Sequence, residues 1–174
     1  LESNQLGNLD KICLDLAVAK AAAMEPTQFH FNLFPSTLVS LDRELIWSMH
    51  KCGGTVCLEV SEKQILGDPG YLLPALQELR SAGIILAIDD VGFGRTCLES
   101  LILIRPEVMK IDRRYVDGVA ADPELRERLG VLLQIAHCLG SQVVAEGVET
   151  EADLALLKDL EVPLAQGYYF GRPG

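Results

Sequence analysis

The sequence lacks a long uninterrupted hydrophobic run. Hydrophobic residues make up 49% of its 174 residues, yet the apolar stretches stop well short of the roughly 18 to 20 residues that a membrane-spanning helix requires. The first residues do not form a basic segment followed by an apolar block, which is the pattern of a secretory signal. The sequence therefore favours neither a membrane protein nor a secretory precursor, and it predicts a globular domain with a sizeable buried core.

Paired cysteines and basic clusters are also missing. The five cysteines are odd in number and widely spaced, which argues against a disulfide scaffold or a thiolate zinc site and favours a cytoplasmic location. The net charge is -10, and no group of Lys and Arg is dense enough to follow a nucleic-acid backbone. We therefore expect no nucleic-acid polymer as a partner, and an anionic ligand would need a local counter-charge such as a metal ion.

Short β-rich runs alternate with helical patterns along the chain, which is typical of strand-helix repeats around a parallel sheet. The runs predict strands over residues 28–34, 55–60, 84–89, 107–112, 142–146 and 164–170. Helices are predicted over residues 8–24, 36–50, 70–82, 97–104, 122–139 and 150–160. Asp122 with Pro123 predicts the start of one helix and Gly140 its end, and Thr150 with Asp153 resembles a capping box. We expect a single domain over residues 1–174.

Two parallel architectures fit this alternation, an open doubly wound sheet and a closed barrel. An open sheet that binds a dinucleotide should carry a glycine-rich turn between a strand and a long helix. The segment Gly92-Phe93-Gly94 is a weak match, because it lacks the third glycine and the acidic residue downstream. A barrel predicts instead that polar residues stand at the carboxyl ends of many strands.

Polar residues do stand near the carboxyl end of all six predicted strands. They are Asn32, Glu59, the pair Asp89 and Asp90, Lys110, Glu146 and Gln166. Alternation along a strand places such residues opposite their apolar neighbours, so they can point into one lumen. We therefore expect an α/β fold of the (β/α)8 TIM-like barrel type. Six strands fall short of the usual eight, so we expect the N-terminal part of the barrel to be missing from this chain.

The carboxylates of Glu59, Asp89, Asp90 and Glu146 would repel one another at one mouth unless cations neutralise them. Carboxylate and amide oxygens without His or Cys suit Mg²⁺ or Mn²⁺. Adjacent aspartates allow one carboxylate to bridge two ions, and two ions about 3.5 to 4 Å apart form a clamp for phosphoryl transfer. Lys110 would then orient the nucleophile or stabilise developing charge. This pattern predicts a two-metal site that holds a phosphate ester.

These polar residues also have purely structural interpretations. On their own, Asp90 and Glu146 would more often be turn or cap residues, because glycine follows soon after each. Lys110 could form a salt bridge with Asp112, and His30 is interpreted as a packed core histidine rather than a ligand. The common placement at strand ends favours the functional interpretation, because independent caps would not produce it.

Several segments match the order and spacing of one family. They are FNLFPSTL (31–38), LEVSE (58–62), AIDDVGFG (87–94), VMKID (108–112), VVAEGVET (143–150) and QGYYFGRP (166–173). With these segments the sequence resembles the EAL domain, the bacterial phosphodiesterase that cleaves the second messenger cyclic di-GMP. The resemblance covers essentially the whole chain. It implies a modified eight-stranded barrel and two-metal hydrolysis of one phosphodiester to linear pGpG.

The resemblance also implies the metal ligands. Asn32, Glu59 and Asp89 would bind the first Mg²⁺ or Mn²⁺ ion, and Asp89, Asp90 and Glu146 would serve the second.

Other matching residues would serve the reaction or support the site. Lys110 would hold the nucleophilic water, with Glu146 as the general base, and Gln166 would contact the substrate or water at the metal. Glu62 would anchor the loop after the aspartate pair, and Glu149 would support the site.

The chain also departs from the family pattern. The Glu-Ala-Leu strand that names the family would precede residue 1, and the loop sequence DDVGFGRTCLESL differs from the usual one over residues 91–97. By the resemblance, this loop after Asp90 would form a homodimer contact, and the parent protein would carry a sensory or GGDEF (diguanylate cyclase) domain. The departures keep a second function open, a non-catalytic cyclic di-GMP receptor or protein-interaction module. A third, a phosphate-binding barrel of unrelated metabolism, lacks a glycine-rich phosphate loop after the late strands.

Overall fold

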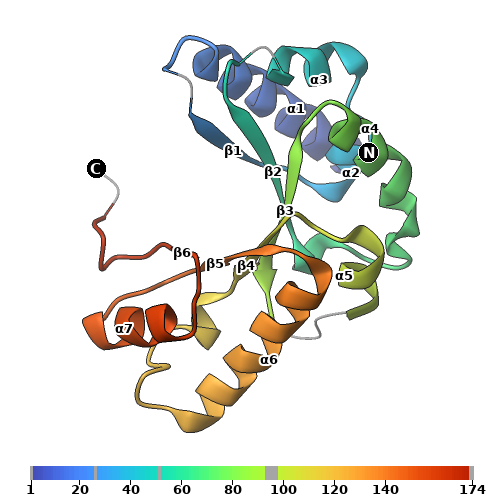
Figure 1. Cartoon of the computed structure of the whole chain (residues 1–174). Helices are drawn as coiled ribbons and strands as arrows, with labels where there is room; N and C mark the ends of the chain where they lie inside the picture. Colours follow the sequence, from blue (N-terminus) through green and yellow to red (C-terminus); the bar gives the residue numbers. More distant parts are fainter. Residues whose placement is uncertain (1, 26, 51, 93–97, 173–174) are drawn as a thin grey trace. The chain divides into compact units, whose positions relative to one another are not determined.

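The structure, a computed structural model, describes residues 2–25, 27–50, 52–92 and 98–172 (Figure 1). Strands alternate with helical segments along the chain. The strands are β1 (Gln28–Asn32), β2 (Thr55–Ser61), β3 (Ile85–Val91), β4 (Val108–Ile111), β5 (Gln142–Ala145) and β6 (Leu164–Ala165). The α-helices are α1 (Glu2–Ala21), α2 (Pro35–Val39), α3 (Arg43–His50), α4 (Leu73–Ser81), α5 (Leu98–Ile104), α6 (Pro123–Leu139) and α7 (Glu151–Asp159). Short 3-10 helices are η1 (Glu62–Gln64), η2 (Pro69–Leu72) and η3 (Arg113–Tyr115).

The strands form a six-stranded sheet whose order follows the chain, β1-β2-β3-β4-β5-β6. The pairs β1-β2, β4-β5 and β5-β6 are parallel, and helical segments lie in the connections between strands. Parallel neighbours in chain order are what a strand-helix barrel requires. The predicted α/β class with a parallel sheet is therefore confirmed. The chain divides into two compact units, residues 1–87 and 88–174, within β3.

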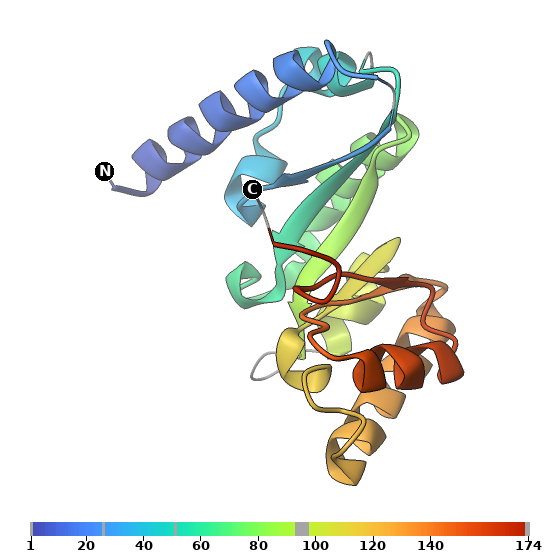
Figure 2. The same ribbon diagram turned by 90° about the vertical axis from the view of Figure 1, so that its left-hand side faces the viewer.

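In unit 1, β1 and β2 lie side by side as a parallel pair. Phe29 pairs with Val56 and Asn32 with Glu59. Alternation along β1 buries Phe29, whereas Asn32 on the other face is exposed. Helix α1 contacts β1 as well as α2 and α3 (Figure 2), and it buries Leu14 against this core.

Unit 2 packs α6 and α7 on the same side of β4, β5 and β6 (Figures 1 and 2). Asp122 begins α6, because its carboxylate accepts hydrogen bonds from the backbone N–H groups of Glu124 and Leu125 at 2.9 and 3.1 Å. Gly140 ends the helix with φ of 73°, a conformation that favours glycine. Thr150 caps α7 by accepting a hydrogen bond from the Asp153 N–H at 3.1 Å. Both helix starts and the glycine stop are as the sequence predicts.

Three elements differ from the sequence prediction. The first helix, expected over residues 8–24, is α1 and spans Glu2–Ala21. The helix expected over residues 36–50 is two helices, α2 and α3, because Asp42 interrupts it and caps α3 through a 2.8 Å hydrogen bond from the Leu45 N–H. The strand expected over residues 164–170 ends at Ala165. After Gln166 the chain turns, and the N–H of Phe170 donates a hydrogen bond to the Gly167 carbonyl.

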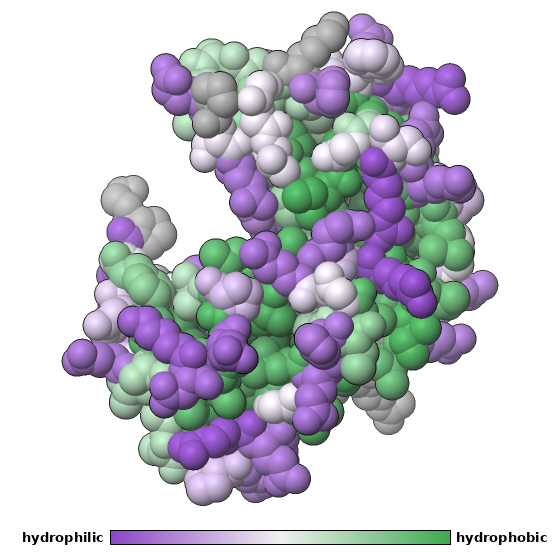
Figure 3. All heavy atoms as spheres, in the orientation of Figure 1, coloured by the Kyte–Doolittle hydropathy of each residue, from purple (hydrophilic) through white to green (hydrophobic). Residues whose placement is uncertain are grey.

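The described helices include none that is both long and apolar enough to cross a bilayer. On the face of unit 2 that Figure 3 shows, hydrophilic side chains lie among smaller hydrophobic patches over α6 and α7. The interior of this unit is apolar, and Ile104, Met109, Ile111 and Leu129 are fully buried there.

Candidate functional site

Unit 1 brings two of the predicted metal ligands together. Asn32 is the last residue of β1, and Glu59 stands directly across from it on β2. The Glu59 side chain is only 5% exposed. A cavity of about 120 Å³ opens beside the pair. Its lining residues are Asp10, Asn32, Leu33, Phe34, Glu59, Ser61 and Gln64.

His30 contacts Glu59, which the sequence pattern did not predict. Its Nδ1 atom lies 2.5 Å from Oε1 of Glu59. The imidazole is 37% exposed, so the interpretation of His30 as a packed core histidine is wrong. The alternation of β1 offered a signal, because His30 lies two residues before Asn32 and therefore on the same face.

Glu62 begins η1 directly after β2 and is buried. The chain thus carries two buried carboxylates within four residues, Glu59 on the strand and Glu62 just beyond it. The predicted role of Glu62 is to anchor the loop after Asp90. Most of that loop, residues 93–97, lies outside the described residues, and so do the predicted loop changes at Phe93, Arg95, Thr96 and Cys97.

Unit 2 brings four predicted site residues together, namely Asp89, Lys110, Glu146 and Gln166. The Nζ atom of Lys110 lies 3.2 Å from Oδ1 of Asp89 and 2.9 Å from Oε1 of Glu146. The side-chain amide of Gln166 donates a hydrogen bond to the same Glu146 oxygen at 2.6 Å. Lys110 is buried on β4, so its charge is weakly screened there. The cluster therefore contains two carboxylates held close together by one buried cation.

Strand pairing positions this cluster. Glu146 and Gln166 each follow the last paired residues of β5 and β6, Ala145 and Ala165. The Glu146 N–H bonds to the Ile111 carbonyl at 3.1 Å, and the Gln166 N–H bonds to the Ala145 carbonyl at 2.9 Å. The carboxyl ends of β4, β5 and β6 are thus aligned, as the barrel interpretation predicted for Lys110, Glu146 and Gln166.

Asp90 stands next to the cluster in an unusual backbone conformation. Its φ is 60°, in the left-handed region that residues other than glycine rarely adopt. Its N–H donates a hydrogen bond to the Asp89 carboxylate at 3.0 Å. The conformation lies within β3, between Asp89 and the glycine turn at Gly92, and it is the kind of local strain that often accompanies functional sites.

The segment from Glu146 to Glu149 is braced by Arg113. The guanidinium lies 3.0 Å from Glu149 and 2.9 Å from Asp117. The hydrogen bond to Asp117 and the charge of Glu149 both raise the pKa of Arg113. The stem of Arg113 packs on Gly147, where an added Cβ would lie 2.3 Å from Arg113 Cγ. Glu149, whose predicted role is to support the site, thus pairs with this arginine.

The predicted ligands carry donor atoms of the chemical type that divalent cations bind. Asn32 and Glu59 in unit 1, and Asp89, Asp90 and Glu146 in unit 2, offer carboxylate and amide oxygens, which are the ligands that Mg²⁺ and Mn²⁺ prefer. Each unit places two of these residues close together, and the second pair already holds the cationic group of Lys110. Within the described ranges, no three or more His, Cys, Asp or Glu side chains form a ready metal cluster.

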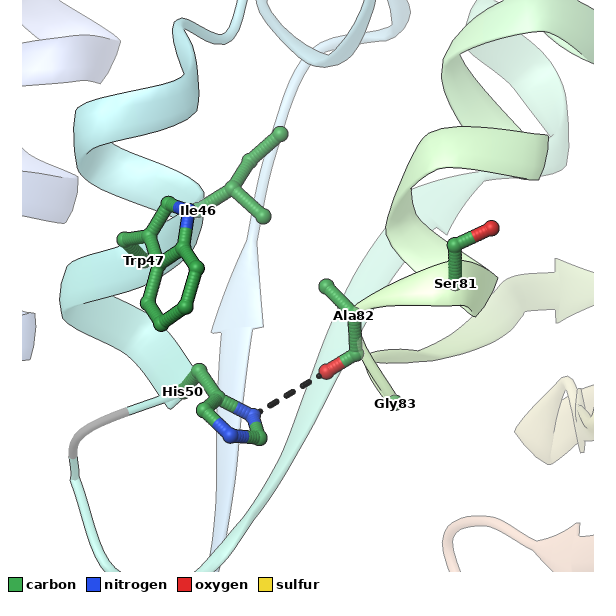
Figure 4. Close-up of a pocket in the computed structure, with 6 residues that line it drawn as sticks. All are labelled: Ile46, Trp47, His50, Ser81, Ala82 and Gly83. Atoms are coloured by element: carbon green, nitrogen blue, oxygen red, sulfur yellow. Dashed lines mark hydrogen bonds between the residues drawn. The ribbon is translucent and has the colours of Figure 1, made fainter.

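A larger cavity of about 400 Å³ in unit 1 contains none of the predicted residues (Figure 4). It lies between the ends of α3 and α4, where His50 bonds to the Ala82 carbonyl at 3.2 Å and Trp47 is exposed. These residues come just before β2 and β3 begin, whereas the predicted site residues lie where the strands end. The chemistry predicted from the sequence is therefore absent from this cavity.

Comparison with known proteins identifies the family. The sequence profile of the EAL domain matches residues 1–173. The chain belongs to the EAL domain family. Among curated relatives of this EAL domain, cyclic di-GMP phosphodiesterase NbdA of Pseudomonas aeruginosa is 33% identical over 170 residues, which cover 95% of this chain and 22% of NbdA. The chain thus spans less than a quarter of the length of that relative.

Solved EAL structures share the fold. Klebsiella pneumoniae BlrP1 in a manganese and cyclic di-GMP complex gives a TM-score of 0.82 at 30% identity, covering 94% of this chain and 44% of that one. A calcium and cyclic di-GMP complex of the same protein gives 0.81 at 28% identity, with the same shares covered. The PaMucR phosphodiesterase in complex with c-di-GMP gives 0.81 at 26% identity, covering 99% of this chain and 79% of that one. The family resemblance and the barrel-type fold expected from the sequence are confirmed.

Proposed function

We propose that the intact protein hydrolyses cyclic di-GMP to linear pGpG with two Mg²⁺ or Mn²⁺ ions. The observation that carries this proposal is the arrangement of Lys110 between Asp89 and Glu146, with Gln166 bonded to Glu146. Relatives named cyclic di-GMP phosphodiesterases and EAL structures that contain cyclic di-GMP support the choice of substrate.

The metal ligands in this proposal are those that the family resemblance implies. Asn32, Glu59, Asp89, Asp90 and Glu146 would supply their carboxylate and amide oxygens. When bound, the two cations would supply the positive charge that activates water and stabilises the attacking and leaving oxygens of the phosphodiester.

The residues of unit 2 have distinct roles in the reaction. Glu146 accepts the proton of the attacking water, because its Oε1 atom is held in place by Lys110 and Gln166. Lys110 orients the water and opposes the negative charge that develops on the phosphate. Arg113 keeps the segment from Glu146 to Glu149 in position through its ion pair with Glu149.

The proposal also covers the setting of the enzyme. It comprises a cytoplasmic protein with one EAL domain, a homodimer contact at the loop after Asp90, and a sensory or GGDEF domain in the parent protein. The chain has fewer basic residues (15) than acidic residues (25), which fits a ligand-specific site rather than binding of a nucleic-acid polymer.

Product analysis tests the function. Full-length protein incubated with cyclic di-GMP and Mn²⁺ should yield pGpG, measured by liquid chromatography. Asp89→Asn should abolish the product, because it removes the charge from a proposed bridging ligand. Glu124→Gln is the matched control, because Glu124 is an exposed carboxylate of the same unit that pairs with Arg128 on the surface. Absence of pGpG with folded wild-type protein and Mn²⁺ would reject the proposal.

A cyclic di-GMP receptor is the second candidate function. The loop departures over residues 91–97 favour it. Calorimetric titration separates the two functions. A receptor binds cyclic di-GMP tightly in the presence of EDTA and leaves it intact, whereas the enzyme consumes it once Mn²⁺ is added.

A further inference from the structure

His30 occupies a position from which it controls the Glu59 carboxylate. Glu59 stands opposite Asn32, and His30 lies two residues earlier on β1, so its side chain reaches Glu59 diagonally across the strand pair. Phe29 and Phe31 lie on the other face of β1, where their rings stack with centroids 6.5 Å apart. The stacked rings fix the orientation of the strand and hence the face on which His30 and Asn32 stand.

Nδ1 of His30 lies 2.5 Å from Oε1 of Glu59. A carboxylate that binds a cation is ionised and only accepts hydrogen bonds, so in the metal-binding form of Glu59 the donor of this contact is Nδ1–H. Glu59 is 5% exposed, whereas the imidazole is 37% exposed. The histidine thus holds one oxygen of a nearly fully buried carboxylate from the solvent side, which fixes the direction in which that carboxylate points.

The neighbourhood of Glu59 has room for a hydrated cation. The cavity of about 120 Å³ beside it is lined by further oxygen-bearing side chains, including those of Asp10, Asn32 and Ser61. The carboxylate of Asp10 also accepts a hydrogen bond from the Phe34 N–H at 2.9 Å, which ties α1 to the segment after β1. Orientation of Glu59 therefore decides how well its oxygens meet a cation in this cavity.

We propose that His30 is a positioning residue for divalent-cation binding, because its Nδ1–H group orients Glu59. This inference rests on the proposed function, in which Glu59 is a metal ligand. Hydrogen-bond partners of ligating groups set ligand orientation and basicity, and their loss typically costs about 10- to 100-fold in metal affinity. His30 is expected to contribute within that range although it makes no bond to the metal itself.

Titration of the full-length protein with Mn²⁺ alone, followed by calorimetry, tests this role without relying on turnover. His30→Ala should weaken Mn²⁺ binding about 10- to 100-fold. His30→Asn should recover most of the affinity, because the Asn side-chain N–H stands close to the place of Nδ1. His30→Gln should recover less, since its N–H lies one bond farther out. The contrast between Asn and Gln remains informative even if His30→Ala lowers the stability of the strand.

His50→Ala provides the matched control. His50 is an exposed histidine of the same unit, and its Nδ1 atom bonds to the Ala82 carbonyl in the cavity of Figure 4. Its removal should leave Mn²⁺ affinity unchanged. Equal affinities for wild type, His30→Ala and His30→Gln would overturn the role of His30.

The outcomes also separate this inference from the proposed function. If the wild type binds Mn²⁺ and yields pGpG while the His30 variants bind Mn²⁺ normally, the inference fails and the proposed function stands. If the wild type binds no Mn²⁺ and yields no pGpG, the proposed function fails. The metal-positioning role, which rests on it, then fails too.

Discussion

The two units stabilise their site carboxylates by different means. In unit 1 a hydrogen bond from an imidazole orients one buried carboxylate, that of Glu59. In unit 2 the ammonium group of Lys110 lies between two carboxylates, those of Asp89 and Glu146, and neutralises much of their mutual repulsion. The loss of the orienting group and the loss of the neutralising group differ in free-energy cost. Removal of an orienting donor costs one hydrogen bond, whereas removal of the shared cation leaves two like charges facing each other in a poorly hydrated place.

Loss of the ammonium group should produce the largest effect. Lys110→Met keeps the length of the side chain and should lower the rate of pGpG formation about 100- to 1000-fold, because a buried group that opposes transition-state charge is gone. Chromatographic rate measurements check this, with Lys158→Met on the exposed last turn of α7 as the control. A Lys110→Met protein that keeps more than a tenth of the wild-type rate would contradict the expected difference between the two units.

A smaller effect should follow from disturbing the brace beneath Glu146. Gly147→Ala introduces a Cβ that would lie 2.3 Å from Arg113 Cγ, at a φ of 73°. We expect at least a tenfold loss of turnover, because the residue next to Glu146 must move.

Gly140→Ala is a closely matched control for that substitution. Gly140 has the same φ of 73°, and an added Cβ there meets nothing within 4 Å. Gly140→Ala should lose about 1 to 2 kcal/mol of unfolding free energy through backbone strain, measured by urea denaturation. Gly147→Ala should lose more, because its Cβ also meets Arg113. Only Gly147→Ala should lose turnover, and equal losses of turnover would show that Arg113 is not a brace for the site.

The smallest effect on turnover concerns a carboxylate of unit 2 outside the site. Asp153 is 1% exposed. Burial alone would raise its pKa, but hydrogen bonds from Thr150 and from the N–H groups of Ala120 and Gly118 outweigh that and lower the pKa. Asp153→Asn should lower the unfolding free energy at pH 7 by about 1 to 3 kcal/mol and leave the turnover of folded protein unchanged.

The pH dependence of that loss follows from the direction of the pKa shift. A lowered folded-state pKa contributes stability above the ordinary carboxyl pKa of about 4, and the contribution is lost as the pH falls through the folded-state value. The stability difference between wild type and Asp153→Asn should therefore shrink below about pH 4 in urea unfolding at a series of pH values. A difference that stays constant down to pH 2 would contradict the role assigned to these hydrogen bonds.

Local signals in the sequence predicted most of the fold. All six predicted strands are present, and Asp122, Gly140 and Thr150 mark helix ends as expected. The break between α2 and α3 was missed, because Asp42 had to be recognised as a cap inside an apparently continuous helical pattern. The last strand was predicted too long, because the apolar residues Tyr169 and Phe170 resemble strand residues although their backbone forms turns.

The site was predictable in its membership but not in its contacts. Placement at strand ends was enough to single out Asn32, Glu59, Lys110, Glu146 and Gln166 as candidates. The pairing of Lys110 with both Asp89 and Glu146 depends on strand register and side-chain rotamers, which no short stretch of sequence encodes. The role of His30 was missed for the same reason, since Glu59 is 29 residues away in the chain.

The left-handed backbone at Asp90 has an evolutionary consequence. An aspartate at φ of 60° costs about 1 to 2 kcal/mol relative to glycine. Glycine at position 90 would relieve this cost and at the same stroke delete a carboxylate of the proposed catalytic centre. Backbone strain alone would therefore favour glycine at this position, whereas the proposed chemistry would favour the acid. Among descendants of such a domain, the residue found at position 90 becomes a marker of whether hydrolysis is still being maintained.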